Sequence, residues 1–252
     1  ITVNKRAITV KAADGSKTYD GAALTNAAAT LTAGTLVSGQ SLTATATGSI
    51  TNVGSTANTV SSAVVKSGTT DVSGNYTITK TNGTLTVNKR TLTVKADAKS
   101  KTYGAGDPGL TYTYSNQVSG QTPKFSGALS RDAGENVGTY AIKQNTLALA
   151  DSSTFLANNY TIAYTGANLT INAKNASTFT VTLSSTSYTY DGNAKTPTVT
   201  VKDGNTTLTL NTHYTVTYSN NINAGTATAT ITGKGNYTGT KAVNFTINKR
   251  TL

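Results

Sequence analysis

The sequence predicts an all-β chain: a tandem array of three small antiparallel β domains, each an Ig-like sandwich or a β-grasp-like fold, arranged end to end. Two observations predict this class. Residues that favour half-buried strands (Thr, Val, Ile and Tyr) alternate with small or polar ones, while 23 Gly and abundant Asn and Ser supply turns at short intervals. In addition, a set of short motifs recurs in the same order along the chain, as expected of repeated domains.

The strands of each repeat are predicted from alternation with a period of two residues. Four runs alternate in this way: residues 7–10, 84–87, 214–218 and 226–231. One face of each strand is therefore expected to be buried and the other exposed to solvent. We expect six or seven short strands in each repeat. Periodicity does not give their order in the sheets.

The junctions between repeats carry an Asn-Lys-Arg motif that ends one strand and opens the next. No Gly-, Ser- or Pro-rich linker separates the two strands, so we expect little bending there. The second junction departs from the motif and contains extra small residues, which predicts more bending. The junction residues are Asn88, Lys89 and Arg90 after the first repeat and Asn172 and Lys174 after the second.

The domain boundaries follow from these junctions. Residues 1–6 resemble the end of a repeat, since 1–4 match 85–88, and are expected to form the last strand of a preceding one. Residues 250–252 are expected to open a following one. Between them we predict repeat 1 at residues 7–89, repeat 2 at 90–174 and a shorter repeat 3 at 175–249.

Three landmarks keep a fixed spacing within the repeats. A Tyr lies 33 residues before an Asn-x-Gly motif in all three, and an Asn-Tyr pair lies 56 residues after that Tyr in repeats 1 and 2 but 46 after it in repeat 3. Ten residues are therefore missing from one loop or hairpin of repeat 3. The landmarks are Tyr19, Asn52, Gly54, Asn75 and Tyr76 in repeat 1, Tyr103, Asn136, Gly138, Asn159 and Tyr160 in repeat 2, and Tyr190, Asn223, Gly225, Asn236 and Tyr237 in repeat 3.

The residues after the first landmark Tyr predict a turn. In Asp20-Gly21 and Asp191-Gly192 the Asp is expected to accept a hydrogen bond from a nearby backbone N–H and the Gly to adopt a positive φ. The Tyr ring is expected to fill the edge of a small core, with its hydroxyl on a backbone partner. Gly104 replaces the Asp in repeat 2, which favours a structural role for these Asp residues over a catalytic one.

These motifs resemble the MBG and YDG repeat domains of bacterial surface proteins. The openings at residues 17–21, 101–108 and 188–197 are similar to the signature of those domains. Residues 129–140 and 233–240 resemble the MBG type further. The resemblance implies a YDG type for repeat 1, an MBG type for repeat 2 and a YDG-like type for repeat 3. It also implies tandem domains in large secreted or surface-exposed adhesin-like proteins, in which most copies are spacers, and it carries over no catalytic residue.

The chain is poor in residues for catalysis or metal binding. Cys is absent, His213 is the one His and Glu135 the one Glu, and Asp132 with Glu135 are the acids that lie near each other in sequence. We therefore expect no enzyme activity, no cofactor and no metal. A crosslink between Lys and Asn or Asp that uses a neighbouring Glu is open only to repeat 2, and we do not expect it.

The net charge is +11, from 21 Lys and Arg against 10 Asp and Glu. Such a charge attracts anionic polymers such as cell-wall polyphosphates, acidic polysaccharide or DNA. Because the basic residues are scattered and no nucleic-acid motif is present, solubility is the favoured explanation. No apolar run is long enough to cross a bilayer.

The sequence therefore favours a structural spacer or stalk of a bacterial surface or secreted adhesin-like protein, located outside the cell, whose partners are neighbouring repeats. One alternative is a glycan-binding module that uses exposed tyrosines. Another is a fibre-forming subunit that donates its terminal strand to the next molecule, so that deletion of residues 1–6 abolishes polymers. The candidate tyrosines are Tyr112, Tyr114, Tyr188 and Tyr218.

Overall fold

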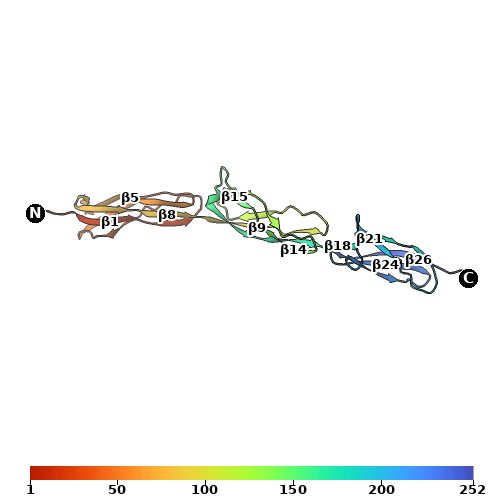
Figure 1. Cartoon of the computed structure of the whole chain (residues 1–252). Helices are drawn as coiled ribbons and strands as arrows, with labels where there is room; N and C mark the ends of the chain where they lie inside the picture. The colour runs from red at the N-terminus through yellow and green to blue at the C-terminus, as the bar shows by residue number, and fades with distance from the viewer. Residues whose placement is uncertain (252) are drawn as a thin grey trace. The chain divides into compact units, whose positions relative to one another are not determined.

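The computed structural model describes residues 1–251 and is all-β (Figure 1). Helical segments in this described range are three single turns of 3-10 helix: η1 (Ser73–Asn75), η2 (Ala157–Asn159) and η3 (Ala176–Thr178). The predicted all-β class is confirmed. The chain forms two compact units, one made of Ile1–Val94, Thr113–Ala128 and Thr146–Thr165, the other of Lys95–Tyr112, Leu129–Asn145 and the described residues from Gly166 onward.

The predicted repeat boundaries are not tested by this division, because the two units share repeat 2 between them. The first strand begins at Arg6, and residues 1–5 lie outside strands. The segment predicted to open a following repeat, 250–252, ends in Leu252, which lies outside the described residues. Repeats 1, 2 and 3 are used below as names for residues 7–89, 90–174 and 175–249.

The first unit contains four sheets. Their strand orders are β3-β1-β7, β2-β8-β5-β4 with β6 beside β5, β11-β9-β16, and β12-β15. The strands are β1 (Arg6–Ala12), β2 (Gly15–Thr18), β3 (Ala29–Ala33), β4 (Gln40–Thr47), β5 (Gly54–Ser67), β6 (Thr70–Asp71), β7 (Tyr76–Thr81), β8 (Gly83–Asn88), β9 (Arg90–Ala96), β11 (Tyr112–Ser115), β12 (Lys124–Ser126), β15 (Ala148–Ala150) and β16 (Tyr160–Thr165).

The second unit also contains four sheets. Their orders are β10-β17-β14-β13, β18-β25, β19-β21-β22 and β20-β26-β24-β23. The strands are β10 (Lys99–Thr102), β13 (Ser130–Arg131), β14 (Gly138–Lys143), β17 (Ala167–Asn172), β18 (Lys174–Asn175), β19 (Thr180–Leu183), β20 (Ser187–Thr189), β21 (Val199–Asp203), β22 (Thr206–Thr207), β23 (Tyr214–Ser219), β24 (Gly225–Gly233), β25 (Tyr237–Thr238) and β26 (Thr240–Asn248).

The sheets are mixed, which differs from the purely antiparallel sheets predicted. β1 runs parallel to β7 and β2 parallel to β8, and β10–β17, β18–β25 and β20–β26 are parallel pairs as well. In repeat 1 the chain passes from β1 in the first sheet to β2 in the second, and beside it from β7 in the first sheet to β8 in the second. Gly83 lies at this crossing, where a Cβ atom would be 2.4 Å from the Ala13 carbonyl oxygen. Alternation in the sequence marks a strand but not its direction.

The cores of the units are thin and come from alternating strand positions. In β1, Ile8, Val10 and Ala12 are buried and their neighbours are not. The four runs predicted from alternation all lie in strands, namely β1, β8, β23 and β24. The cores are small clusters: Ile8, Val65 and Tyr76, and Val10, Ala12, Ala46 and Val60 in the first unit; Phe179, Val201, Leu208, Tyr214, Ile231 and Tyr237 with Ala176, and Leu183, Ala227, Ala229, Phe245 and Ile247 in the second.

Candidate functional site

The landmark tyrosines of repeats 1 and 2 meet in the first unit. The rings of Tyr19 and Tyr160 pack edge to face, with centroids 5.5 Å apart and an angle of 79°. Gln121 joins their hydroxyls: its amide donates to the Tyr19 oxygen at 2.8 Å, and its carbonyl oxygen accepts from Tyr160 at 2.7 Å. The backbone N–H of Val118 donates to the Tyr160 hydroxyl at 3.0 Å. The Tyr19 hydroxyl thus has a side-chain partner in the next repeat, not the backbone partner expected.

The landmark asparagines meet beside the tyrosines. The Asn159 side-chain oxygen accepts from the backbone N–H of Val53 at 2.9 Å, and its amide donates to the Asn52 side-chain oxygen at 3.0 Å. Asn159 is 1% exposed, so this two-way bond is shielded from water. We call Tyr19, Asn52 and Val53 of repeat 1 together with Gln121, Asn159 and Tyr160 of repeat 2 the first joint.

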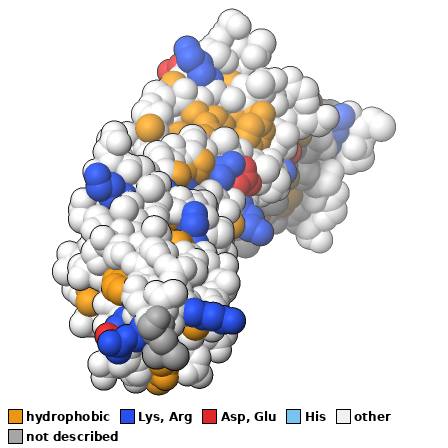
Figure 2. Space-filling model, turned by 90° about the vertical axis from the view of Figure 1, so that its right-hand side faces the viewer, with side chains coloured by type: hydrophobic (Ala, Val, Ile, Leu, Met, Phe, Trp, Pro, Cys, Tyr) orange, Lys and Arg blue, Asp and Glu red, His pale blue; other side chains and the backbone are white. Residues whose placement is uncertain are grey.

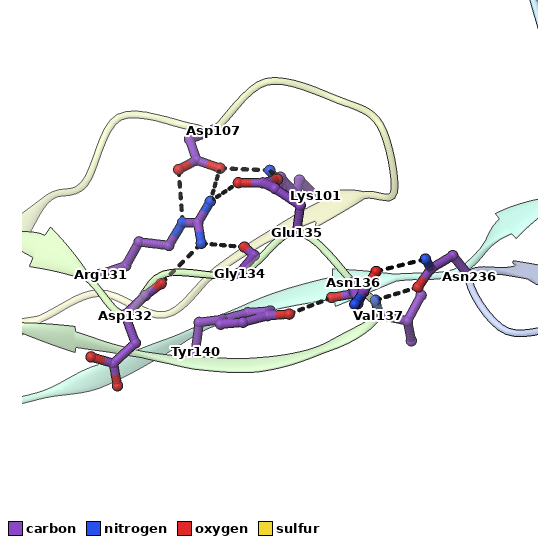
Figure 3. A network of polar contacts seen from close by, with 10 residues as sticks. All are labelled: Lys101, Asp107, Arg131, Asp132, Gly134, Glu135, Asn136, Val137, Tyr140 and Asn236. Carbon is purple, nitrogen blue, oxygen red and sulfur yellow. Dashed lines mark hydrogen bonds and ion pairs between the residues drawn. The ribbon is translucent and has the colours of Figure 1, made fainter. Parts of the chain in front are cut away.

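The second unit contains a second joint, between repeats 2 and 3, with the same tyrosine packing and the same asparagine hydrogen bonds. Tyr103 packs edge to face on Tyr237 at 5.4 Å and 80°. The Asn236 oxygen accepts from the N–H of Val137 at 2.8 Å, and the Asn236 amide donates to the side-chain oxygen of Asn136 at 2.9 Å (Figure 3). The landmarks that recur in the sequence are therefore brought together in space, one set from each of two successive repeats.

The Asn-x-Gly motif places its Asn two residues before the start of a strand. Gly54, Gly138 and Gly225 are the first residues of β5, β14 and β24 and have φ values of 148°, 158° and 143°. This backbone region is open almost only to glycine. The chain therefore turns sharply before the strand and presents the Asn and the following N–H at its end.

The other predicted motif residues build the frame behind the joints. Asp20 and Asp191 each accept a hydrogen bond at 2.9 Å from the N–H two residues later, as a turn-forming Asp does. Gly21 and Gly192 have φ of 83°, whereas in repeat 2 the positive φ, 81°, moves to Gly104. The N–H groups of the landmark tyrosines donate to the carbonyl oxygens of the junction asparagines: Tyr19 to Asn88 at 2.9 Å, Tyr103 to Asn172 at 2.8 Å and Tyr190 to Asn248 at 2.9 Å.

The junction residues differ between the two joints. Arg90 donates through Nε to the Asn116 carbonyl at 2.6 Å and through one guanidinium nitrogen to the Asn116 side chain at 3.0 Å, while another nitrogen reaches the Tyr19 carbonyl at 3.5 Å. Lys89 is exposed. After repeat 2, Lys174 instead pairs with Asp203 of repeat 3 at 2.5 Å. In the described contacts, side chains of the following repeat therefore donate hydrogen bonds to the landmark Tyr in the first joint only, from Gln121 and Arg90 to Tyr19.

A network of four charged side chains lies next to the second joint (Figure 3). Lys101 is 4% exposed at its side chain and contacts Asp107 at 2.7 Å and Glu135 at 2.5 Å. Arg131 holds both oxygens of Asp107, at 2.8 and 3.1 Å, and also pairs with Glu135. Sequence reasoning missed this network, because its members are spread over 35 positions; Asp132, placed near Glu135 by sequence, pairs with Lys143 instead.

The network fixes both the charges and the loop around it. Hydrogen bonds from Arg131 and Lys101 lower the pKa of Asp107 to about 2, and those from Asp107 and Glu135 raise the pKa of Lys101. Arg131 also donates to the carbonyl oxygens of Asp132 at 2.9 Å and Gly134 at 2.5 Å. The loop that carries Asn136 into the second joint is therefore held by charge-assisted bonds.

The same charge state opposes the crosslink considered for repeat 2. Formation of an amide bond requires a neutral amine as nucleophile and a carboxyl group able to lose its oxygen. Lys101 is held as an ammonium ion, and Asp107 as a carboxylate bound by Arg131. Lys101, Asp107 and Glu135 therefore lie close together as members of an ion-pair network.

The tyrosines considered for glycan binding differ in exposure. Tyr188 and Tyr218 are partly buried and pack edge to face on Phe245, and the Tyr218 hydroxyl donates to the Pro197 carbonyl oxygen at 2.5 Å. Tyr114 is 39% exposed and its ring lies 5.5 Å from Phe125. Tyr112 is partly buried. No open row of aromatic rings is formed by these four residues.

The single His has a structural contact in the described chain. His213 Nδ1 accepts from the backbone N–H of Thr209 at 2.9 Å, and its ring lies edge to face on Tyr237 at 6.0 Å. Within residues 1–251, no group of three or more His, Cys, Asp and Glu side chains is placed to hold a metal ion. No helix in that range has the length and apolar character needed to cross a bilayer.

Basic side chains are dispersed on the face shown in Figure 2, with apolar and uncharged atoms between them. They do not gather into one patch on that face. This distribution matches the scattered positions of Lys and Arg in the sequence.

Part of the chain is similar to a known domain family. Residues 92–170 match the model of the family described as MBG domain (YGX type), which confirms the resemblance for less than half of the chain. No curated protein matches the chain.

Among solved structures, the chain is similar to extracellular domains of protocadherins. That of protocadherin GammaB4 is 10% identical, with a TM-score of 0.25 over 99% of this chain and 50% of the other. Cadherin domains 1–5 of protocadherin Gamma B2 are 12% identical, with a TM-score of 0.25 over 99% and 60%. The chain thus spans about half the length of these structures.

Proposed function

We propose that this chain is a structural spacer of a bacterial surface or secreted adhesin-like protein, and that its joints keep successive repeats in line so that a binding region is projected. The observation that carries the proposal is the repetition of one joint by equivalent residues, Tyr19, Asn52 and Asn159 in the first and Tyr103, Asn136 and Asn236 in the second. A binding or catalytic site is formed once, whereas a joint that recurs at each boundary serves the array itself.

As part of the same proposal, we infer that the chain has no catalytic role and that it lies outside the cell. His213 is engaged by a backbone N–H, and the charged network keeps Lys101 protonated, so neither group is prepared as a base. The match of residues 92–170 to MBG domains supports a surface setting. Neighbouring repeats are the proposed partners, and the dispersed positive charge leaves weak contact with anionic surface polymers open to test.

We expect narrow distance distributions between spin labels placed on either side of each joint. Because the chain has no Cys, two introduced Cys residues are labelled uniquely. Pairs at the exposed positions Thr43 and Thr113 report on the first joint, and pairs at Ser100 and Thr206 report on the second. The first distribution should be the narrower, since Gln121 and Arg90 reach Tyr19 across the first joint only. Pulsed electron-electron double resonance on the full chain measures both.

Two outcomes of this measurement would contradict the proposal or one part of it. If both distributions are as broad as those of freely jointed domains, the repeats tumble independently and the spacer proposal fails. If the second joint is the narrower, the proposed role of Gln121 and Arg90 is wrong while the spacer role stands.

A further inference from the structure

Repeat 3 has a hollow beside the edge of one of its sheets. β23 is the outer strand of that sheet: β24 pairs with it on one side, and no other strand of residues 1–251 pairs with it. It is six residues long and has neither a charged residue nor a Pro, which commonly protect such an edge. In repeat 2 the strand at this place, β13, has two residues and carries Arg131. The hollow along β23 measures about 650 Å³, and its lining includes Pro197, Val199, Leu210, Tyr214, Val216 and Tyr218.

Two residues of β23 direct their backbone groups away from the sheet. The Tyr214 carbonyl oxygen accepts from the N–H of Asn211 at 2.7 Å, outside the sheet. Successive residues of a strand direct their backbone groups to opposite sides, so those of Val216 and Tyr218 face away from β24 as well. Asn211 covers the edge at Tyr214. Among the described residues, no backbone group bonds to Val216 or Tyr218 on that side.

Repeat 1 closes the equivalent edge with its own chain. Its outer strand is β4, and the Ala46 N–H donates to the Ala27 carbonyl oxygen at 2.9 Å. Ala28 and Thr45 form a bridge beside this bond. A hollow of about 440 Å³ remains there, lined by residues of repeat 1 alone although repeat 2 follows. A neighbouring repeat therefore does not cover this place, and a stretch of backbone does occupy the strand edge.

The strand registers identify the equivalent residues of repeat 3. Ala27 lies two residues before the partner of Ala12, and Pro197 lies two residues before the partner of Leu183. Ala12 and Leu183 both lie seven residues before the landmark Tyr of their repeat, so Pro197 is the equivalent of Ala27. Val216 is likewise the equivalent of Ala46, since the strand partner of each lies six residues after the Gly of the Asn-x-Gly motif.

In repeat 3 this carbonyl oxygen has a different partner. The Pro197 oxygen accepts from the Tyr218 hydroxyl at 2.5 Å, whereas the Ala27 oxygen accepts from a strand N–H. The Tyr218 side chain thus replaces the backbone donor. In the described part of the chain, the Val216 N–H makes no bond to the segment that holds Pro197. The edge closed in repeat 1 is therefore open in repeat 3.

We propose that repeat 3 binds an extended peptide at this edge, as a strand added to β23. Repeat 1 indicates the occupant, because there a stretch of backbone lies on the same edge and bonds to it. The peptide backbone bonds to Val216 and Tyr218. Every second side chain of the peptide then lies in the hollow beside Pro197, Val199 and Leu210, which favours Val, Ile or Leu at those positions. The inference goes beyond the spacer role, since a spacer need not bind a ligand.

Amide hydrogen exchange, followed by NMR on the full chain, tests the proposal. In the free chain the Val216 amide should exchange about tenfold or more faster than the Ala46 amide, which is hydrogen-bonded. The probe is a capped peptide of alternating Thr and Val with a Glu at each end, because the chain carries a charge of +11. We expect a Kd of roughly a millimolar, since a short edge offers few bonds and the peptide loses conformational freedom. Peptide at about ten times the Kd should slow exchange at Val216 about tenfold and leave Ala46 unchanged.

Two controls separate strand pairing from other contacts. The same peptide with every backbone nitrogen methylated keeps its side chains but has no N–H donors, so it should not bind. Val216→Pro removes the N–H that faces the hollow and leaves the bonds to β24, because Pro is tolerated where an edge N–H points outward. The variant should fold and lose peptide binding by about tenfold or more. Ala46→Pro should instead destabilise repeat 1, where the equivalent N–H is bonded.

Several results would overturn the proposal. Equal exchange of the Val216 and Ala46 amides in the free chain would mean that the edge is closed in both repeats. An unchanged Val216 signal up to roughly ten millimolar peptide would mean that no strand is added. Equal binding of the methylated peptide would exclude backbone pairing. If maltotriose shifts the signals of Tyr218 and the peptide does not, the hollow is a sugar site and not a peptide site. The exchange and methylated-peptide results decide the matter even if Val216→Pro fails to fold.

Discussion

Replacing Asn159 with Ala is expected to open the first joint and to speed hydrogen exchange of the Val53 amide about tenfold, which corresponds to about 1.4 kcal/mol. The side chain is 1% exposed and makes two bonds to the preceding repeat, at 2.9 and 3.0 Å. Loss of one partner from a shielded pair costs about 1–3 kcal/mol, and the exposed position of Asn52 puts this case at the lower end. Hydrogen exchange suits the full chain because unfolding of several domains is not two-state.

The repeats supply a matched control for this variant. Asn75 holds the same motif position in repeat 1, but its side chain is exposed, so Asn75→Ala should change stability by less than about 0.5 kcal/mol. Asn236→Ala should speed exchange at Val137, since Asn236 accepts from that N–H. Equal effects of Asn75→Ala and Asn159→Ala would mean that the Asn serves its own turn and not the joint.

The spacing of the landmarks could be predicted from the sequence, but their partners could not. Tyr19 and Asn52 lie 33 residues apart, and the equivalent residues of repeats 2 and 3 keep the same spacing, which indicates a fold common to the three repeats. Spacing within a repeat is the same whether two motifs meet each other or meet their counterparts in the next repeat. Tyr19 contacts Tyr160, 141 positions away, and only a three-dimensional arrangement reveals that pairing.

Strand direction and the charged network were beyond sequence reasoning for similar reasons. Alternation in residues 7–10 predicts the strand β1 correctly, yet it is the same for parallel and antiparallel neighbours, and β7 proved parallel. Lys101, Asp107 and Arg131 come from separate loops and strands, and their meeting depends on how these pack. Asp132 and Glu135 are neighbours in sequence, but they pair with different cations.

Replacing Arg131 with Gln is expected to loosen the loop at residues 132–137 and with it the second joint. The Arg131 side chain is 11% exposed, and its guanidinium binds two carboxylates and two backbone carbonyl oxygens, which Gln cannot span. Lys143→Gln is the matched control, since it removes one cation from a pair whose members are 61% and 46% exposed. Surface pairs of that kind contribute little. Thermal unfolding and exchange at Val137 should therefore change clearly in Arg131→Gln and hardly in Lys143→Gln.

The effect of Arg131→Gln should depend on pH in a defined direction. The pKa of Asp107 is about 2 in the folded chain, below its ordinary value of 3.8, so the bound carboxylate stabilises the fold fully above about pH 4. That contribution is lost as the pH falls from 3.8 to about 2. In the variant the pKa of Asp107 rises toward its ordinary value, so the stability gap from the wild type should shrink through this window. A gap that stays constant down to pH 2 would show that Arg131 acts by packing and not by its charge.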